Sequence, residues 1–212
     1  MTRHLSEEER RQEILHAAAR EVADRGVGQV TMAAIAARTS LSKGGVYRFY
    51  ANKREVLLDL FRYLMMRYAS VEHSEALGWG KSLTETLVYI TLVRMCEEEE
   101  ADGLRWGAVW VQLLPEALWD EAFAQVLHEG EGYQRQRFGA LVLDLLRRDG
   151  MRLRPGADLD RMLRVGVAYG EGMLLALLLR GEPMEELVQQ FGFLIDLLIR
   201  DLVETREGGT CE

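Results

Sequence analysis

The chain has 212 residues, a mass of 24.2 kDa and a formal net charge of −8 at pH 7, a length that allows one large helical domain or a small domain with a larger one. The N-terminal residues are charged and lack the apolar core of a signal peptide. The two cysteines, Cys96 and Cys211, have neither metal-site nor disulfide-framework spacing, so we expect a soluble, cytoplasmic protein.

The first predicted helix covers residues 6 to 25. Gly26 follows it at the position of a helix-ending glycine. We expect this helix to cover the back of the two short helices that follow and to complete a three-helix unit. Its inward stripe consists of Ile14, Leu15, Ala18 and Val22.

The stretch from Thr31 to Lys53 predicts two short helices joined by a tight turn through Ser40 and Leu41. Two helices joined so tightly leave the second one exposed, where it can enter a major groove of DNA. The alternative is an ordinary helical hairpin whose second helix is weakened by glycine, at about 1 kcal/mol per glycine. The residues expected to face inward are Met32, Ile35, Ala36, Val46 and Tyr50.

The outer face of this stretch suits contact with DNA. Thr31 and Ser42 can each cap a helix start, and the N–H groups exposed there suit a phosphate oxygen. Two of the chain's three lysines lie here, and two adjacent glycines let the backbone come close to a ligand. The predicted DNA-binding residues are Thr31, Ser42, Lys43, Gly44, Gly45, Tyr47, Arg48 and Lys53.

The same residues resemble the DNA-binding domain of the TetR family of bacterial transcriptional repressors over about the first 70 residues. Three departures occur: Ser40-Leu41 replaces the usual Gly-Val of the turn, Gly44 takes a place where another residue is common, and Phe49-Tyr50 replaces His-Phe. The resemblance implies a repressor that binds a palindromic operator as a homodimer and is released by a small, apolar effector. The matching positions are Thr31, Ile35, Ala36, Ser42, Gly45, Tyr47, Tyr50, Lys53 and Leu57.

Charge is distributed unevenly along the chain. Residues 1 to 54 contain ten basic and six acidic side chains, a local charge of +4, so that the remainder carries −12 of the total of −8. A locally basic face is what phosphate binding requires, and an acidic body away from the DNA does not prevent it.

The rest of the chain is helical by pattern, so we expect an all-α protein. A helix from Asn52 to about Ser70 and a break from His73 to Gly80 come first, and five helices follow. The domains predicted are a helix-turn-helix DNA-binding domain (1–52), a connecting helix (53–70) and an effector-binding and dimerisation domain (71–212). The five later helices are expected at about 81–99, 103–114, 117–149, 158–180 and 184–205, and the third can be interrupted near Gly130 to Gly132.

The last two helices are unusually apolar. The final one has apolar residues on more than one face, which predicts a second packing partner, and the helix before it has small residues that permit close approach. We expect a four-helix dimer interface, with burial inside one subunit as the alternative. The predicted dimerisation residues are Gly166, Gly170, Leu187, Phe191, Leu194, Ile195, Leu198 and Leu202.

The body also contains many large side chains that could line an effector pocket. Aromatic and methionine residues at helical spacing also form ordinary cores, and this alternative stays open. The longest apolar run, Val165 to Leu179, is interrupted by Glu171 and is too short to span a bilayer. The predicted ligand residues are Trp106, Trp110, Tyr133, Phe138, Tyr169 and Met173.

Sequence motifs of enzymes are missing. The four histidines share no metal-ligand spacing, and the chain has neither a G-x-S-x-G sequence nor a phosphate-binding glycine loop. The acidic run Glu97–Glu100 is best explained as a solvated face. We therefore expect no enzyme activity, no cofactor, no metal and no membrane partner. The alternative to a regulator is a helical protein-interaction module with a vestigial helix-turn-helix.

Overall fold

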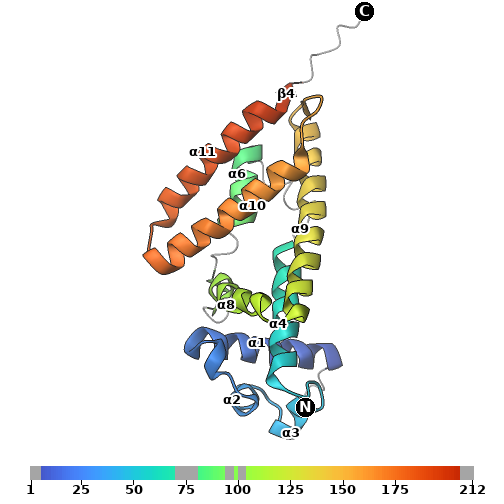
Figure 1. Cartoon of the computed structure of the whole chain (residues 1–212), viewed down its shortest axis with the longest axis vertical. Helices are drawn as coiled ribbons and strands as arrows, with labels where there is room; N and C mark the ends of the chain where they lie inside the picture. Colours follow the sequence, from blue (N-terminus) through green and yellow to red (C-terminus); the bar gives the residue numbers. More distant parts are fainter. Residues whose placement is uncertain (1–5, 70–80, 94–97, 100–103, 206–212) are drawn as a thin grey trace, which may run out of the picture. The chain divides into compact units, whose positions relative to one another are not determined.

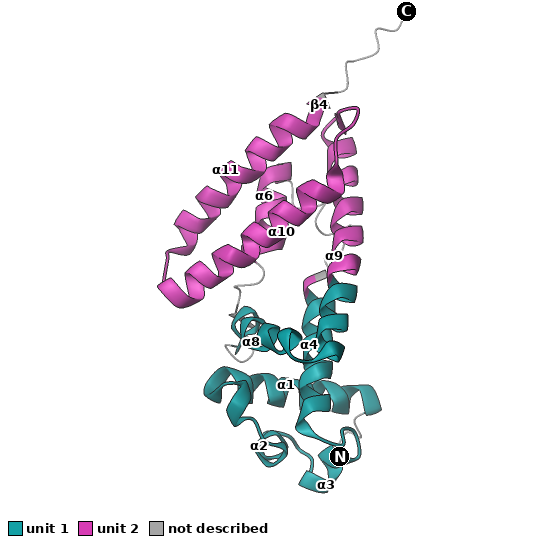
Figure 2. Cartoon of the chain, in the orientation of Figure 1, with its two compact units in different colours: residues 1–67, 97–130 teal, residues 68–96, 131–212 magenta. Residues whose placement is uncertain are grey.

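The structure, a computed structural model, describes residues 6–69, 81–93, 98–99 and 104–205. It is predominantly helical, and it divides into two compact units, which Figure 2 shows in separate colours. Unit 1 contains residues 1–67 and 97–130, and unit 2 contains residues 68–96 and 131–212. The predicted all-α class is confirmed. The break expected at residues 73–80 lies outside the described residues.

Unit 1 begins with the helices that the sequence predicts. The Ser6 hydroxyl accepts a hydrogen bond from the Glu9 N–H, and the Glu9 carboxylate accepts one from the Ser6 N–H, so a capping box starts the first helix. That helix ends at Gly26, whose φ of 81° is costly for other residues. The elements, labelled in Figure 1, are α1 (Glu7–Arg25), a 3₁₀ turn (Val27–Gln29), α2 (Met32–Ala37), α3 (Lys43–Tyr47) and α4 (Lys53–Ala69).

The predicted inward faces of these helices form the core of this part of unit 1. Burial of apolar side chains at helical spacing is what holds such short helices in place, because α2 and α3 are too short to be stable alone. The predicted inward residues are all buried: Ile14, Leu15, Ala18, Val22, Met32, Ile35, Ala36, Val46 and Tyr50. On α4 the buried residues are Val56, Leu57, Leu60, Phe61, Leu64, Met65 and Tyr68.

The remainder of unit 1 departs from the prediction at helix ends. Residues 98–99, expected at the end of a helix, instead form strand β1 (Glu98–Glu99), which pairs antiparallel with β2 (Leu104–Arg105). A run of glutamates is unfavourable at a helix C-terminus, where the dipole is negative. The elements that follow are α8 (Trp106–Leu113), a 3₁₀ segment (Leu114–Leu118) and α9 (Glu121–Arg148).

Helix α9 continues through Gly130 and Gly132, so the suggested interruption there is wrong. A Cβ on Gly130 would lie 2.7 Å from Cε and 2.8 Å from Cβ of Met65 on α4. This glycine therefore allows two helices of unit 1 to approach closely and does not end one of them.

Unit 2 is built from helices and one short strand pair. Helix α6 (Leu83–Val88) continues as a π-helical turn (Tyr89–Val93), and β3 (Met151–Leu153) pairs antiparallel with β4 (Val203–Thr205). The two long helices are α10 (Leu159–Leu175), extended by a π-helical turn (Ala176–Arg180), and α11 (Met184–Leu202).

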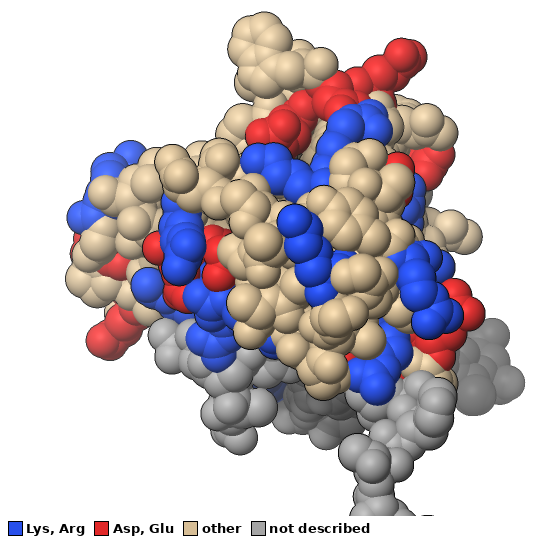
Figure 3. Space-filling model, turned by 90° about the horizontal axis from the view of Figure 1, so that it is seen from below, with Lys and Arg blue, Asp and Glu red and all other residues tan. Residues whose placement is uncertain are grey.

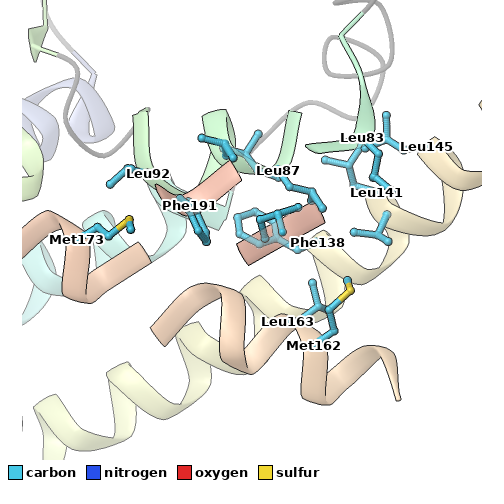
Figure 4. Close-up of a cluster of buried hydrophobic side chains, with 14 of the residues drawn as sticks. Leu83, Leu87, Leu92, Phe138, Leu141, Leu145, Met162, Leu163, Met173 and Phe191 are labelled. Carbon is cyan, nitrogen blue, oxygen red and sulfur yellow. The ribbon is translucent and has the colours of Figure 1, made fainter. Parts of the chain in front are cut away.

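The core of unit 2 joins side chains from α6, α9, α10 and α11, as Figure 4 shows around Phe138, Phe191 and Met173. The apolar run Val165–Leu179 is part of a longer continuous helix, Leu159–Arg180, which has 22 residues and a mean hydropathy of 1.6. By length and composition this helix could cross a membrane, so the expectation that the segment is too short is wrong. Core helices pass the same test, and its residues Met162, Leu163, Met173 and Leu174 are buried, so we interpret it as a core helix.

Candidate nucleic-acid interface

Thr31 and Ser42 start the two short helices in the way the sequence predicts. The Thr31 hydroxyl accepts a hydrogen bond from the Ala34 N–H at 3.1 Å, and the Ser42 hydroxyl accepts one from the Gly45 N–H at 3.1 Å. Each hydroxyl satisfies one of the N–H groups that a helix start leaves free. The other N–H groups at these helix starts can bind an anion.

The turn between α2 and α3 forms without the usual glycine. No residue other than glycine has a positive φ in the described part of the chain, so Ser40 and Leu41 need no left-handed conformation. The Thr39 hydroxyl donates to the Ala36 carbonyl at 3.0 Å and accepts from the Leu41 N–H at 3.2 Å. These side-chain bonds fix the turn in place of glycine.

Helix α1 supports the same turn from behind. The Glu13 carboxylate accepts the Ser40 N–H at 2.5 Å, and Arg10 donates to both Glu13 and the Ser40 hydroxyl. Burial raises the pKa of the Glu13 carboxyl, but the hydrogen bonds from Ser40 and Arg10 outweigh it and hold that pKa below its usual value. The sequence did not identify Glu13, because no local pattern marks a contact across 27 residues.

A second contact fixes α2 against α1. The Arg38 guanidinium donates from Nε to Glu21 at 2.5 Å and from Nη2 to Asp24 at 2.6 Å. The Glu21 side chain is only 3% exposed, so this ion pair lies largely out of water, and removing Arg38 would leave a buried carboxylate with only the longer contact to Arg25, at 3.7 Å. Arg38 therefore contributes to the packing of the helix-turn-helix more than to its outer charge.

The outer face of α3 carries exposed polar and aromatic groups. Lys43, Tyr47 and Arg48 are exposed, and the Lys43 ammonium lies 6.0 Å from the centre of the Tyr47 ring. A Cβ on Gly44 would meet only the Ser42 hydroxyl, at 3.9 Å, whereas a Cβ on Gly45 would lie 3.2 Å from Cβ of Leu41. Gly44 thus leaves room for a ligand, while Gly45 allows the turn to pack.

Some cations of unit 1 form ion pairs with acidic side chains and others do not. Lys43 and Arg48 form no ion pair with any residue that the structure describes. Figure 3 looks onto the end of unit 1 that carries α2 and α3, and it shows Lys and Arg side chains across the middle, with Asp and Glu side chains mainly toward the margin. Arginines of unit 1 that do have acidic partners include Arg10 (Glu13), Arg11 (Glu7), Arg25 (Glu21), Arg38 (Glu21 and Asp24), Arg54 (Asp120) and Arg62 (Asp59).

The junction between α3 and α4 contains two further predicted positions. Lys53 is partly buried, and its ammonium donates to the Gly28 carbonyl at 3.4 Å, so it has a partner within unit 1. Tyr50 is buried, as predicted, and its hydroxyl donates to the Asp59 carboxylate at 2.6 Å. Burial and then the Asp59 carboxylate raise the pKa of Tyr50, which therefore stays neutral.

The predicted ligand residues lie mostly in packed cores. Trp106 and Trp110 are buried in unit 1, where the Trp106 ring lies 4.9 Å from His16 and the Trp110 Nε1–H donates to the Met65 sulfur at 3.4 Å. Phe138 and Met173 are buried in unit 2. These four residues are therefore buried among other apolar side chains of their own unit. Tyr133 is partly buried, and Tyr169 is 40% exposed.

The predicted dimerisation residues also face inward to a large extent. Leu187, Phe191 and Ile195 are buried in unit 2, and Leu194, Leu198 and Leu202 pack partly against the same core. Gly166 and Gly170 are also buried, and a Cβ on Gly170 would lie 2.8 Å from Cγ2 of Thr91. The close approach that Gly170 permits is therefore to the π-helical turn of the same chain.

Other residues of α10, its π-helical extension and α11 are large, apolar and exposed, and the sequence did not predict them as dimerisation residues. Along each helix these residues lie between the buried ones in sequence. Which side of a helix faces the core depends on tertiary packing, so periodicity alone could not identify them. Together we call these exposed residues the α10–α11 surface. Its large members are Val165, Tyr169, Leu175, Leu179, Phe193 and Leu197.

Comparison with known proteins agrees with these features. Residues 14–60 match the family model described as bacterial regulatory proteins of the tetR family. The match runs from the middle of α1 through α2 and α3 into the first part of α4. No curated protein sequence matches the chain.

Solved structures share the fold over nearly the whole chain. A chain described as a TetR-family transcriptional regulator of Rhodococcus sp. has a TM-score of 0.72 at 21% identity and covers 90% of this chain and 99% of its own. A transcriptional regulator of Saccharomonospora viridis, in complex with choline, has a TM-score of 0.70 at 20% identity, with coverages of 93% and 100%. SmeT, the repressor of a Stenotrophomonas maltophilia multidrug efflux pump, has a TM-score of 0.62 at 23% identity, with coverages of 95% and 96%. The resemblance to the TetR family is therefore confirmed.

Proposed function

We propose that this chain, which has the fold of TetR-family transcriptional regulators, represses transcription in the cytoplasm by binding a palindromic operator as a homodimer. The observation that supports DNA binding is the outer face of α3. Lys43 and Arg48 are exposed there, without an acidic partner among the described residues, on a helix that Ser42 caps. Cations on a short exposed helix suit the phosphates and base edges of a major groove.

The predicted residues have different roles in this proposal. Lys43, Tyr47 and Arg48 read base edges, with Gly44 allowing close approach of the backbone. Thr31, Ser42 and Lys53 position the protein on phosphates. Gly45 acts indirectly, through the turn. Functionally, we divide the chain into a DNA-binding domain (1–52), a connecting helix (53–70) and a regulatory body (71–212).

We propose that the homodimer forms through the α10–α11 surface. Phe193 is 73% exposed and Leu179 is 75% exposed. Large apolar side chains that are so exposed suit burial against a second copy of the chain. Phe193→Glu should give monomers in analytical ultracentrifugation at micromolar concentration, while Gln136→Glu, at an exposed polar position of α9, should not. A monomeric parent protein would contradict the dimer.

We also propose that a small molecule releases the protein from DNA. Unit 2 has a groove of about 500 Å³, which is in the usual size range of ligand sites. An apolar effector would fit against Val88, Tyr89, Val93 and Val188, and Lys81, Thr84 and Glu85 form the polar part of the lining. The S. viridis relative holds choline, so a protein of this fold can bind a small molecule. A screen for compounds that release operator DNA tests this step, and a screen without any active compound would count against it.

Selection of bound fragments from the source genome tests DNA reading directly. We expect fragments with a palindrome, because a two-fold dimer presents two copies of α3. Lys53→Ala should weaken binding to all sequences alike, whereas Lys43→Ala and Arg48→Ala should also change sequence preference. If Lys43→Ala only scaled all affinities, its role in base reading would be wrong.

A further inference from the structure

A pocket between α9 and α10 of unit 2 is lined mainly by charged and polar side chains, in contrast to the apolar core of this unit. Its volume is about 230 Å³, and it combines carboxylates, guanidinium groups and a small apolar wall. None of the predicted ligand or dimerisation residues lines it. The lining residues are Glu131, Gln134, Arg135, Arg164, Val167, Ala168 and Glu171.

The two arginines of this pocket are already neutralised. Arg164 Nε lies 2.7 Å from one carboxylate oxygen of Asp160, and Arg135 Nε lies 3.4 Å from the other. Arg135 is also 3.7 Å from the Glu131 carboxylate. Both arginines therefore form their ion pairs with Asp160 and Glu131, and neither forms one with Glu171.

Glu171 is the carboxylate of the lining that takes no part in the ion pairs of Arg135 and Arg164. It is partly buried, and no hydrogen bond or ion pair reaches its carboxylate from any described residue. Burial, and then the negative charge of Glu131, raise its pKa to about 7. A carboxylate in this position is costly to ionise until a cation approaches it.

We propose that this pocket binds a small organic cation, a primary or secondary ammonium compound, with Glu171 as its counter-ion. The ammonium group donates to the Glu171 carboxylate, and the Glu131 charge adds to the attraction. The apolar side of the ligand lies against Val167 and Ala168. A metal ion is a poorer fit, because no three His, Cys, Asp or Glu side chains of the described residues come together as a metal site.

The pocket also predicts how binding depends on pH. Glu171 is protonated below its raised pKa, so the ligand must displace a proton there, and it binds the ionised form above that pKa. For a pKa of about 7, the affinity for an ammonium ion falls about tenfold between pH 8 and pH 6. The ligand itself stays charged over this interval, because alkylammonium groups have pKa values near that of lysine.

Calorimetry with the full-length protein tests the proposal without DNA, so its outcome does not depend on the proposed regulatory function. The probes are n-butylammonium and benzylammonium, with n-butanol and benzyl alcohol as uncharged counterparts. We expect the two ammonium compounds, and not the alcohols, to bind at pH 8. At pH 6 the ammonium compounds should bind about tenfold more weakly. Equal binding of the alcohols, or no binding of either ammonium probe, would overturn the proposal.

Two substitutions locate the site. Glu171→Gln keeps the shape of the side chain, and it should weaken binding about tenfold or more and remove its pH dependence. Glu129→Gln, on the exposed side of α9, should change neither. If Glu171→Gln fails to fold, Glu131→Gln should still weaken binding and should lower the pKa of Glu171 measured by carbon NMR. Parent-like affinity and pH dependence in Glu171→Gln or, where it does not fold, in Glu131→Gln would contradict the assignment.

Discussion

Two glycines of α9 allow a sharp test of the packing in unit 1. Gly130→Ala places a Cβ 2.7 Å from Cε and 2.8 Å from Cβ of Met65, whereas Gly132→Ala meets nothing within 4 Å. Both substitutions gain the same helix propensity, about 1 kcal/mol. Only the first adds an overpacking cost, of about 1–3 kcal/mol. The difference in the free energy of unfolding between the two variants therefore isolates the contact with Met65.

Urea denaturation followed by far-ultraviolet circular dichroism measures this difference. Gly132→Ala should be more stable than the parent by up to about 1 kcal/mol. Gly130→Ala should be less stable than Gly132→Ala by about 1–3 kcal/mol, with equal m-values. The Cβ of Met65 is fixed to its own helix, so rotation of the side chain cannot relieve that contact. Equal stability of the two variants would show that α4 and α9 do not approach as described.

Three further predictions concern single contacts. Gly170→Ala, whose Cβ would lie 2.8 Å from Cγ2 of Thr91, should lower the free energy of unfolding by about 1–3 kcal/mol relative to Gly172→Ala, whose Cβ meets nothing; equal urea midpoints would refute this. Glu13→Gln should cost about 1 kcal/mol at pH 7. The pKa of Glu13 is lowered in the folded state, so its contribution to stability is present above its pKa in the unfolded chain and is lost as the pH falls through its pKa in the folded protein. The stability of Glu13→Gln should therefore fall less with acid than that of the parent, which denaturation at several pH values would show. Tyr50→Phe removes the 2.6 Å hydrogen bond to a carboxylate and should cost about 1–2 kcal/mol in thermal unfolding, without changing DNA affinity.

Local signals were sufficient for much of unit 1. The caps at Thr31 and Ser42, the helix end at Gly26 and the buried stripe of α1 depend on residues within a few positions of one another, and the structure confirms each. The turn is different, since Ser40 depends on Glu13, which lies 27 residues earlier. A contact of this kind has no local pattern, so the sequence could show that glycine was missing but not what replaces it.

The later helices show why faces are harder to predict than helices. The width of the apolar surface on α11 predicts a second packing partner for that helix, but periodicity cannot say which side meets the subunit's own core. Phe191, which the sequence assigned to the dimer interface, is buried, whereas Phe193, which the sequence did not single out, is exposed. Glycine is ambiguous in the same way: Gly130 predicted a break, while its neighbour Met65 shows that it serves close packing. Glu171 was visible as an interruption of an apolar run, but its pocket depends on α9.

The salt dependence of DNA binding shows whether the cations of α3 and α4 bind DNA. Each protomer offers Lys43, Arg48 and Lys53, so a dimer that uses all three against phosphates or nearby base edges should show a slope of log affinity against log salt near −5. Lys53→Ala should make that slope shallower by about 2, one phosphate contact in each protomer. Binding that does not depend on salt, or no binding to any genomic fragment, would contradict DNA recognition by α3 and would favour a protein-interaction module.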